Sequence, residues 1–256
     1  MADWLYWPDF EARTGPANMA IDQTLLELAG EEGLSVLRIY RWEPFTLSFG
    51  RNEPAARRYD RAAIAREGIP TVRRPTGGRA VWHARELTYA VSAPTGCFGT
   101  LPAAYHAIHA MLAEGIRTLG ADATLAADRS VAGLDAGACF ASPAGGEVMI
   151  QGRKVVGSAQ VRLGDGMLQH GSLLLDDDQS RIVALTRGQA PAGREIPLNR
   201  VLATPVSFED ASAAVAAAAR RAWPGEWQHL AATTQILERA QTHVARFSSD
   251  DWTWHR

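Results

Sequence analysis

Residues 147–175 contain three strand-like runs separated by two glycine turns, and this pattern constrains the fold more than any other. Gln151-Gly152 follows the first run, and Gly164-Asp165-Gly166 precedes the third. Turns of this chemistry join antiparallel neighbours in hairpins. Helical segments lie between the other strand-like runs of the chain. We therefore predict an α+β fold with mixed, largely antiparallel sheets and flanking helices, instead of a doubly wound sheet.

The remaining elements follow from hydrophobic spacing and turn residues. Apolar spacing, N-caps and alanine-rich runs predict helices over residues 17–29, 61–67, 101–119, 208–222 and 230–244. Alternation predicts strands over residues 36–42, 45–50 and 71–74, with an edge strand over 4–7. Residues 80–83 and 86–93 are expected to pair as a hairpin, and the tail from residue 248 is expected to pack as a terminal cover.

The composition limits the class of protein. A chain of 256 residues with 46% hydrophobic and 21% charged residues is an ordinary globular chain, and we expect one domain over 1–256, with a core of about 18–200 and a helical part of about 205–256. The net charge of −2 argues against nucleic acid as a partner. We expect no signal peptide and no membrane span, and the two cysteines point to a reduced, cytoplasmic protein.

Cys139 is a candidate nucleophile. It lies among small and turn-forming residues, which is typical of a loop that a substrate can reach, although a lone cysteine is often only a buried small side chain. A thiol with a pKa of about 8.5 needs a nearby cation to become reactive. Lys154, fifteen residues further on, is a candidate cation, with a solvated strand lysine as the alternative. Cys97 is the rival nucleophile, but it has no lysine or histidine beside it in sequence.

Histidines and a glycine loop complete the candidate set. His83 ends the run RRPTGGRAVWH, where it could line an acyl or anionic pocket or cap a hairpin. His170 lies in an alternating strand and faces either the core or a cleft. Gly77-Gly78 permits close approach of a ligand but matches no nucleotide-binding motif. His106 and His109 have a metal-compatible spacing without further ligands, so we expect no metal site.

Taken together, RRPTGGRAVWH, GRKVVGSAQ and LQHGSLLL resemble the biotin/lipoate protein ligase superfamily, as do Asn18–Asp22 and the Tyr40–Arg51 segment. The resemblance runs from about Asn18 to Leu175. The cysteine in Ala138-Cys139-Phe140, ahead of Gly152-Arg153-Lys154, is similar to that of the cysteine-dependent octanoyltransferases of the lipoate pathway.

This resemblance implies acyl transfer through a thioester. Cys139 would take an octanoyl group from acyl carrier protein, and Lys154 would lower the thiol pKa or hold the carbonyl. The acyl group would pass to a lysine of a lipoyl domain such as the glycine-cleavage H protein, with no cofactor and no metal, and we expect a monomer. The implied substrate-binding residues are Arg74, Thr76, Gly77, Gly78, Arg79, Val81, His83, Gly157, Ser158, Ala159, His170 and Gly171.

The resemblance also implies finer roles around the acyl group. Val81, Val155 and Val156 would help to line an apolar slot for the acyl chain. Backbone amides near Gly77-Gly78 or Ser158-Ala159 could hold the oxyanion.

Three other functions stay open. An ATP-dependent lipoate or octanoate ligase would share Arg74, Gly77-Gly78 and Lys154 and leave Cys139 structural. An octanoyl amidotransferase between lipoyl domains would use the same cysteine with another donor. A non-catalytic carrier-binding module is allowed by Ala84, where the family usually has an acidic residue, and by residues 144–146, which replace an Asp/Tyr pair.

Overall fold

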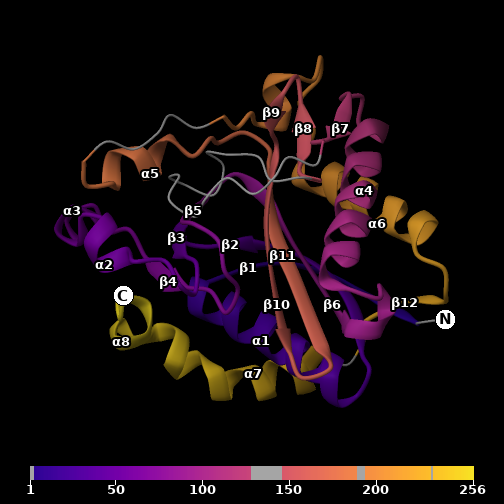
Figure 1. Cartoon of the computed structure of the whole chain (residues 1–256), viewed down its shortest axis with the longest axis horizontal. Coiled ribbons are helices and arrows are strands. Elements are labelled where there is room, and N and C mark those ends of the chain that lie inside the picture. The colour runs from indigo at the N-terminus through magenta and orange to yellow at the C-terminus, as the bar shows by residue number, and fades with distance from the viewer. Residues whose placement is uncertain (1–2, 128–145, 189–193, 232) are drawn as a thin grey trace.

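The computed structural model describes residues 3–127, 146–188, 194–231 and 233–256. Its largest sheet has the strand order β10-β11-β6-β2-β1-β12. The six strands are β1 (Trp4–Arg13), β2 (Ser35–Trp42), β6 (Glu86–Pro94), β10 (Val156–Leu163), β11 (Gly166–Leu174) and β12 (Trp227–His229). Pairing is antiparallel from β10 through β2 and parallel from β2 through β12. The predicted mixed α+β fold is confirmed (Figure 1).

Two small sheets lie beside this large one. The first has the order β4-β3-β5, and its strands are β3 (Thr46–Phe49), β4 (Thr71–Arg73) and β5 (Val81–His83). The second has the order β7-β8-β9, and its strands are β7 (Ala123–Leu125), β8 (Val148–Ile150) and β9 (Arg153–Lys154). Gln151-Gly152 forms the predicted turn between β8 and β9.

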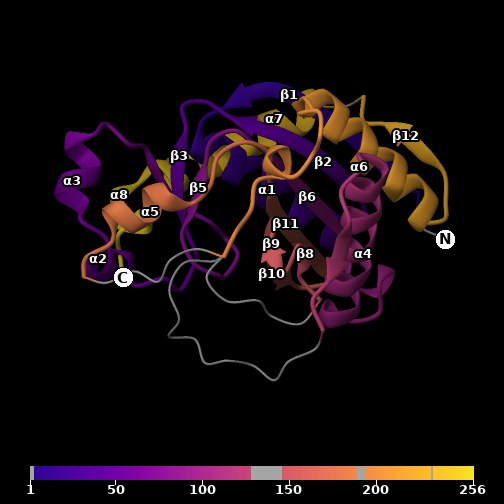
Figure 2. The same ribbon diagram turned by 90° about the horizontal axis from the view of Figure 1, so that it is seen from above.

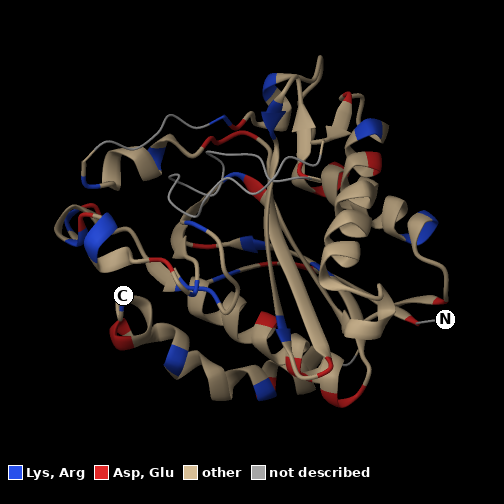
Figure 3. Ribbon diagram, in the orientation of Figure 1, with Lys and Arg blue, Asp and Glu red and all other residues tan. Residues whose placement is uncertain are grey.

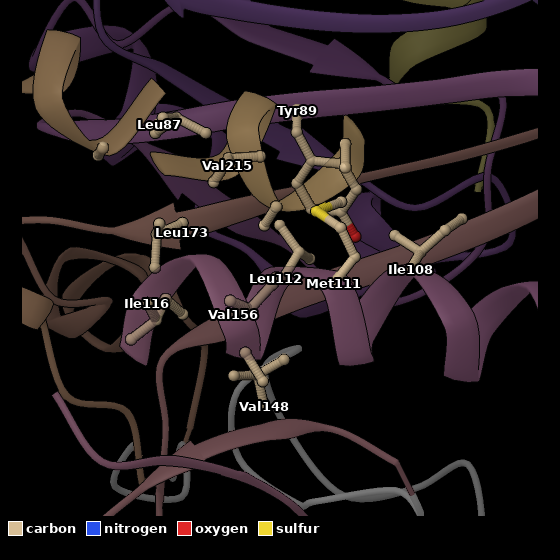
Figure 4. Close-up of a cluster of buried hydrophobic side chains, with 14 of the residues drawn as sticks. Leu87, Tyr89, Ile108, Met111, Leu112, Ile116, Val148, Val156, Leu173 and Val215 are labelled. Atoms are coloured by element: carbon tan, nitrogen blue, oxygen red, sulfur yellow. The ribbon is translucent and has the colours of Figure 1, made fainter. Parts of the chain in front are cut away.

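Helices cover both faces of the large sheet (Figures 1 and 2). On one face, α1 (Gly15–Glu31) packs against β6, β11 and α7 (Thr233–Ser248). On the other face, α4 (Leu101–Thr118) and α6 (Phe208–Ala222) pack against each other and enclose the main hydrophobic core. Figure 4 shows side chains of this core, with Leu112 and Met111 of α4 lying among residues of β6, β10 and β11.

Strand alternation decides which core each residue enters. Leu87, Tyr89 and Val91 of β6 belong to the core beneath α4, whereas Ala90 belongs to the core beneath α1. Successive strand side chains point to opposite faces, so one strand serves both cores. Charged side chains gather on the outer helices and loops, and the long strands β10 and β11 carry few of them (Figure 3). In the described parts of the chain, no helix combines the length and apolar character needed to cross a bilayer.

Local signals set the ends of the long helices. Thr14 caps α1 by accepting a hydrogen bond from the Ala17 amide. Ser207 and Asp210 form a reciprocal capping box at the start of α6, and the helix spans the predicted residues 208–222. The short helices are α2 (Ala55–Arg58), α3 (Arg61–Arg66), α5 (Ser180–Leu185) and α8 (Asp250–Thr253).

Two predictions about strand pairing were wrong. Residues 80–83 and 86–93 do not form a hairpin: β5 pairs with β3 in the small sheet, whereas β6 lies between β2 and β11 in the large one. The segment that begins at Trp4 is not an edge strand, because β12 pairs with its outer side. Alternation identifies a strand, but the partner depends on residues that are far away in the sequence.

The tail packs as a cover, as the sequence predicts. The side chain of Trp254 lies against Phe49, with ring centroids 5.0 Å apart. The guanidinium of Arg73 is fully buried beneath α8 and donates hydrogen bonds to the carbonyls of Trp252 and Thr253 at 3.1 and 3.0 Å. The tail therefore holds the end of β4, from which the glycine loop 75–78 begins.

Candidate active site

A narrow cavity lies where β10 and β11 meet β2, β5 and the loop after β4. Helix α1 contributes Met19 to its wall, and β6 contributes Thr88. The other lining residues are Tyr40, Trp42, Arg74, Val81, His83, Gly157, Ser158, Ala159, His170, Gly171 and Ser172. Apolar and aromatic walls with a few polar groups are typical of a small-molecule site.

Many of the predicted site residues meet at this cavity although they lie far apart in sequence. Those that line it are Arg74, Val81, His83, Gly157, Ser158, Ala159, His170 and Gly171. Thr76 lies behind the wall, fully buried, and contacts His170. Gly77, Gly78 and Arg79 are not among the lining residues; the carbonyls of Gly77 and Arg79 accept hydrogen bonds from the Arg74 guanidinium.

The glycine loop is held by close contact with the chain after β3. A Cβ atom on Gly50 would lie 2.0 Å from the carbonyl oxygen of Gly78, so residue 50 must be glycine for the two segments to meet. Gly78 has a φ of 87°, which glycine adopts without strain. Gly77 is half-buried and Gly78 is exposed, whereas Thr76 is buried.

His170 is fixed by a buried network under the cavity. Its Nδ1 lies 2.7 Å from Asp22 Oδ2, and its Nε2 lies 2.7 Å from the Thr76 hydroxyl. Asp22 also accepts hydrogen bonds from Arg38 and Tyr40, both at 2.8 Å. Burial lowers the pKa of His170, so the neutral imidazole donates from Nδ1 to Asp22 and accepts from Thr76 at Nε2.

The charge of Asp22 keeps this network in one arrangement. Burial raises the pKa of Asp22, but the hydrogen bond from His170 and the charge of Arg38 outweigh it and hold the pKa below its usual value. Asp22 is therefore an anion that fixes the His170 ring, and through Thr76 it fixes the loop that leads to Gly77.

His83 is held in a second network. Its Nδ1 lies 2.6 Å from the Glu86 carboxylate, and its Nε2 lies 2.6 Å from the Ser48 hydroxyl. Arg74 donates to the same Ser48 hydroxyl at 2.6 Å, and the Trp42 ring stacks on the imidazole with centroids 3.9 Å apart. Both ring nitrogens are thus engaged, and the ring itself forms part of the cavity wall.

Lys154 is buried in β9 and forms an ion pair with the buried Glu147 carboxylate. Its backbone amide donates to the Arg194 carbonyl, and its carbonyl accepts from the Ile196 amide. Residues 194–196 therefore hold the backbone of β9 in place. The predicted nucleophile Cys139 lies outside the described residues.

The structure also shows where the valines of the predicted acyl slot and the rival nucleophile Cys97 lie. Val155 and Val156 belong to the main hydrophobic core and are not among the residues that line the cavity, whereas Val81 lines it. The rival nucleophile Cys97 is half-buried in a loop, and burial raises the pKa of its thiol, so it is a poor nucleophile.

Sequence reasoning missed several wall residues and all of the supporting network. The missed wall residues are Met19, Tyr40, Trp42, Thr88 and Ser172. Of these, Met19, Tyr40 and Trp42 lie in the two segments, Asn18–Asp22 and Tyr40–Arg51, that carry the resemblance, so they could have been named. His109 was considered only as a metal ligand, yet its Nε2 lies 2.8 Å from the hydroxyl of Ser158.

Solved structures of lipoate-protein ligases have the same overall fold as this chain. Lipoate-protein ligase A bound with ATP superposes with a TM-score of 0.82 over 99% of both chains, at 18% sequence identity. The bi-partite lipoate protein ligase of Thermoplasma acidophilum superposes with a TM-score of 0.77 over 99% of this chain and 96% of that chain, at 17% identity.

Comparison with known sequences is more specific. Octanoyltransferase LipM of Kyrpidia tusciae is 35% identical to this chain, with 93% of this chain and 94% of the relative covered. Octanoyltransferase LipM of Brevibacillus brevis is 31% identical with full coverage of both. Residues 15–219 match the family model of the lipoyl protein ligase A/B catalytic domain. The chain belongs to the lipoyl protein ligase A/B catalytic domain family.

Proposed function

We propose that this protein is an octanoyltransferase of lipoate biosynthesis. The observation that carries the proposal is its similarity to proteins named octanoyltransferase LipM, at 30–35% identity over nearly the whole length of both partners. The fold alone would fit a ligase equally well, because one fold supports several activities. An acyltransferase needs no nucleotide, since its substrate is already an activated thioester.

The reaction proceeds in two steps. In the first, the Cys139 thiolate attacks the carbonyl carbon of octanoyl-acyl carrier protein, the C–S bond to the carrier breaks, and the carrier leaves as its thiolate. In the second, the ε-amine of a lysine on a lipoyl domain attacks the new thioester, and the cysteine leaves. The assignment of Cys139 rests on its place in the sequence ahead of Gly152-Arg153-Lys154. Splitting the transfer in this way replaces one difficult step by two easier ones.

Lys154 supplies a cation to this centre. Its ammonium is buried, and a charge acts over a longer range in such surroundings than it does in water. The Glu147 carboxylate holds the ammonium in a defined place. We assign Lys154 the role of lowering the Cys139 thiol pKa or of holding the carbonyl oxygen of the thioester.

The cavity serves as the slot for the acyl chain. Met19, Trp42 and Val81 give it apolar walls, and each methylene buried there contributes about 0.8 kcal/mol. The donor is acyl carrier protein and the acceptor is a lipoyl domain such as glycine-cleavage H protein. We place the reaction in the cytoplasm, where the two cysteines of the chain stay reduced.

Intact-mass spectrometry tests the proposal. Mixing the protein with octanoyl-acyl carrier protein should add one octanoyl mass, and adding a lipoyl domain should move this mass to the acceptor. Cys139→Ala should abolish the adduct and the transfer, whereas Cys97→Ala, the matched control, should change neither. A normal transfer rate in Cys139→Ala would exclude the thioester.

A parallel reaction distinguishes the ligase. The protein is given free octanoate or lipoate together with ATP and the lipoyl domain, and pyrophosphate release is measured. An octanoyltransferase releases none above background. Acceptor modification that depends on ATP and persists in Cys139→Ala would establish a ligase instead.

A further inference from the structure

A chain of hydrogen-bonded side chains joins the Leu101 carbonyl to the cavity wall. The side-chain amide of Gln160 donates to Leu101 O at 3.0 Å and to Gln169 Oε1 at 2.8 Å. Gln169 Nε2 in turn donates to the Tyr89 hydroxyl oxygen at 2.9 Å. A backbone carbonyl can only accept, so this end of the chain has a fixed direction.

The other end is fixed by a second carbonyl. His109 Nδ1 lies 2.7 Å from Gly146 O, so Nδ1 carries a proton and donates it. Burial lowers the pKa of His109 to about 4, so the imidazole is neutral at pH 7. Its Nε2 is then an acceptor, and the Ser158 hydroxyl, 2.8 Å away, must donate to it.

This direction determines what Ser158 can offer to a ligand. Its single proton is given to His109, and one of its two acceptor positions takes the proton of the Tyr89 hydroxyl at 2.7 Å. Among the described residues, one acceptor position of the oxygen is left. Ser158 lines the cavity and is only half-buried. The side chain therefore presents an acceptor, and no donor, to a bound molecule.

His109 also contacts two described residues from different parts of the chain. It binds Ser158 on the cavity wall and Gly146, which lies seven residues after Cys139 (146 − 139). The Lys154 ammonium is close enough for its charge to act on the His109 imidazole. One buried side chain thus links the acyl cavity, the proposed cation and the end of the segment that carries the proposed nucleophile.

We propose that the Ser158 hydroxyl oxygen accepts a hydrogen bond from the attacking lysine ε-amine in the second half-reaction, and that His109 is the positioning residue that fixes its polarity. The inference rests on the proposed function. Of the two groups that react in that step, the octanoyl thioester carries no hydrogen-bond donor, whereas the amine carries N–H groups. An oxygen restricted to accepting therefore matches the amine.

The step balances without any further reactant. The lone pair of the neutral amine attacks the thioester carbonyl carbon, the C–N bond forms and the C–S bond breaks. The electron pair of the C–S bond leaves with the sulfur of Cys139, which takes up the proton that the nitrogen loses. A hydrogen bond from the amine to Ser158 orients the nitrogen so that its lone pair faces the carbonyl carbon.

The two half-reactions are measured separately in the full-length protein. The first is acylation of the enzyme by octanoyl-acyl carrier protein, and the second is transfer from purified octanoyl-enzyme to a lipoyl domain. Ser158→Ala should leave the first rate within about twofold and slow the second about tenfold, which is the effect of one hydrogen bond. Transfer to a small thiol, which uses no N–H, should be unaffected.

Conservative variants separate positioning from folding. Ser158→Thr and His109→Gln keep the acceptor and its partner and should restore most of the second rate, whereas His109→Phe should slow it as Ser158→Ala does. Ser92→Ala is the matched control, because its buried hydroxyl has no hydrogen-bond partner among the described residues. Equal slowing of both half-reactions, or no slowing of the second, would overturn the inference. If wild-type enzyme is never acylated, the proposed function itself fails.

Discussion

The roles of three buried histidines differ because their hydrogen-bond partners differ. The Nδ1 atom of His83 contacts the Glu86 carboxylate, and the Nδ1 atom of His170 contacts the Asp22 carboxylate. The Nδ1 atom of His109 instead contacts a neutral group, the carbonyl of Gly146. The sequence pointed to His83 and His170, because both lie in motifs next to glycine-rich turns. It suggested His109 only as half of a metal-compatible pair, because the partners of His109 lie 37 and 49 residues away and cannot be recognised from local spacing.

The depressed pKa of His109 makes stability depend on pH. Its pKa is about 4 in the folded protein against 6.5 in the unfolded chain, so the unfolded state binds more protons between these values. The free energy of unfolding therefore falls as pH falls through this window. Between pH 7.5 and pH 5 we expect His109 to account for a loss of about 2 kcal/mol, measured by urea denaturation at each pH.

Comparison with His109→Gln isolates this effect. The variant has no titrating group at position 109, while His170, whose pKa is also lowered by burial, still titrates in both proteins. The variant should lose about 2 kcal/mol less than wild type over the same pH range. Parallel curves for the two proteins would show that His109 does not titrate as described.

At the scale of elements, the sequence predicted which segments form helices and strands, but it did not predict which distant strands pair. The strand over 36–42 and the helix over 208–222 were confirmed, because alternation and an alanine-rich run are both visible in neighbouring residues. The partner of β5 was missed, since it lies more than thirty residues away at Leu47 and Ser48. At the site, Arg74 and His170 were named from their motifs, whereas Thr88 reaches the cavity only through the packing of β6.

The contact between α1 and β11 depends on an absent side chain. A Cβ atom on Gly166 would lie 2.4 Å from the Leu26 carbonyl oxygen and 2.9 Å from the Gly30 amide nitrogen. Gly166→Ala forces backbone atoms apart, so we expect it to lower the free energy of unfolding by about 2 kcal/mol. Urea denaturation of the purified variant measures this change.

Gly96→Ala is the control for the loss of a glycine. A Cβ atom there would meet no atom of the described residues within 4 Å, and the backbone angle is not one that requires glycine. Its effect should stay within about 0.5 kcal/mol. Similar losses in the two variants would mean that the close approach of α1 and β11 contributes nothing to stability.

At the scale of the whole molecule, α8 completes the small sheet that carries the glycine loop. Arg73 is fully buried, and burial lowers the pKa of its guanidinium to about 10. Its acceptors include the carbonyls of Trp252 and Thr253. Removing residues 249–256 leaves a buried charge with fewer partners, so we expect a loss of about 3 kcal/mol and a fall in Tm of about 10 °C, measured by differential scanning calorimetry.

Trp254→Ala separates packing from hydrogen bonding in this region. The variant loses the contact with Phe49 but keeps the carbonyls that Arg73 uses. It should be less destabilised than the truncated protein and should keep normal octanoyl transfer. If the two proteins have the same Tm, the Arg73 acceptors do not contribute.

The partners of Arg73 also set the order in which the molecule can be finished during synthesis. The carbonyls of Trp252 and Thr253 follow it by 179 and 180 residues, so the ribosome must add nearly all of the remaining chain before the Nε–H of this guanidinium meets its acceptors. Until then the guanidinium can donate to the carbonyls of Gly50, Arg51 and Glu53 but has no acceptor from the tail. A nascent chain arrested before residue 252 would therefore already contain every motif of the active site while the strand that leads into the glycine loop still lacked its cover.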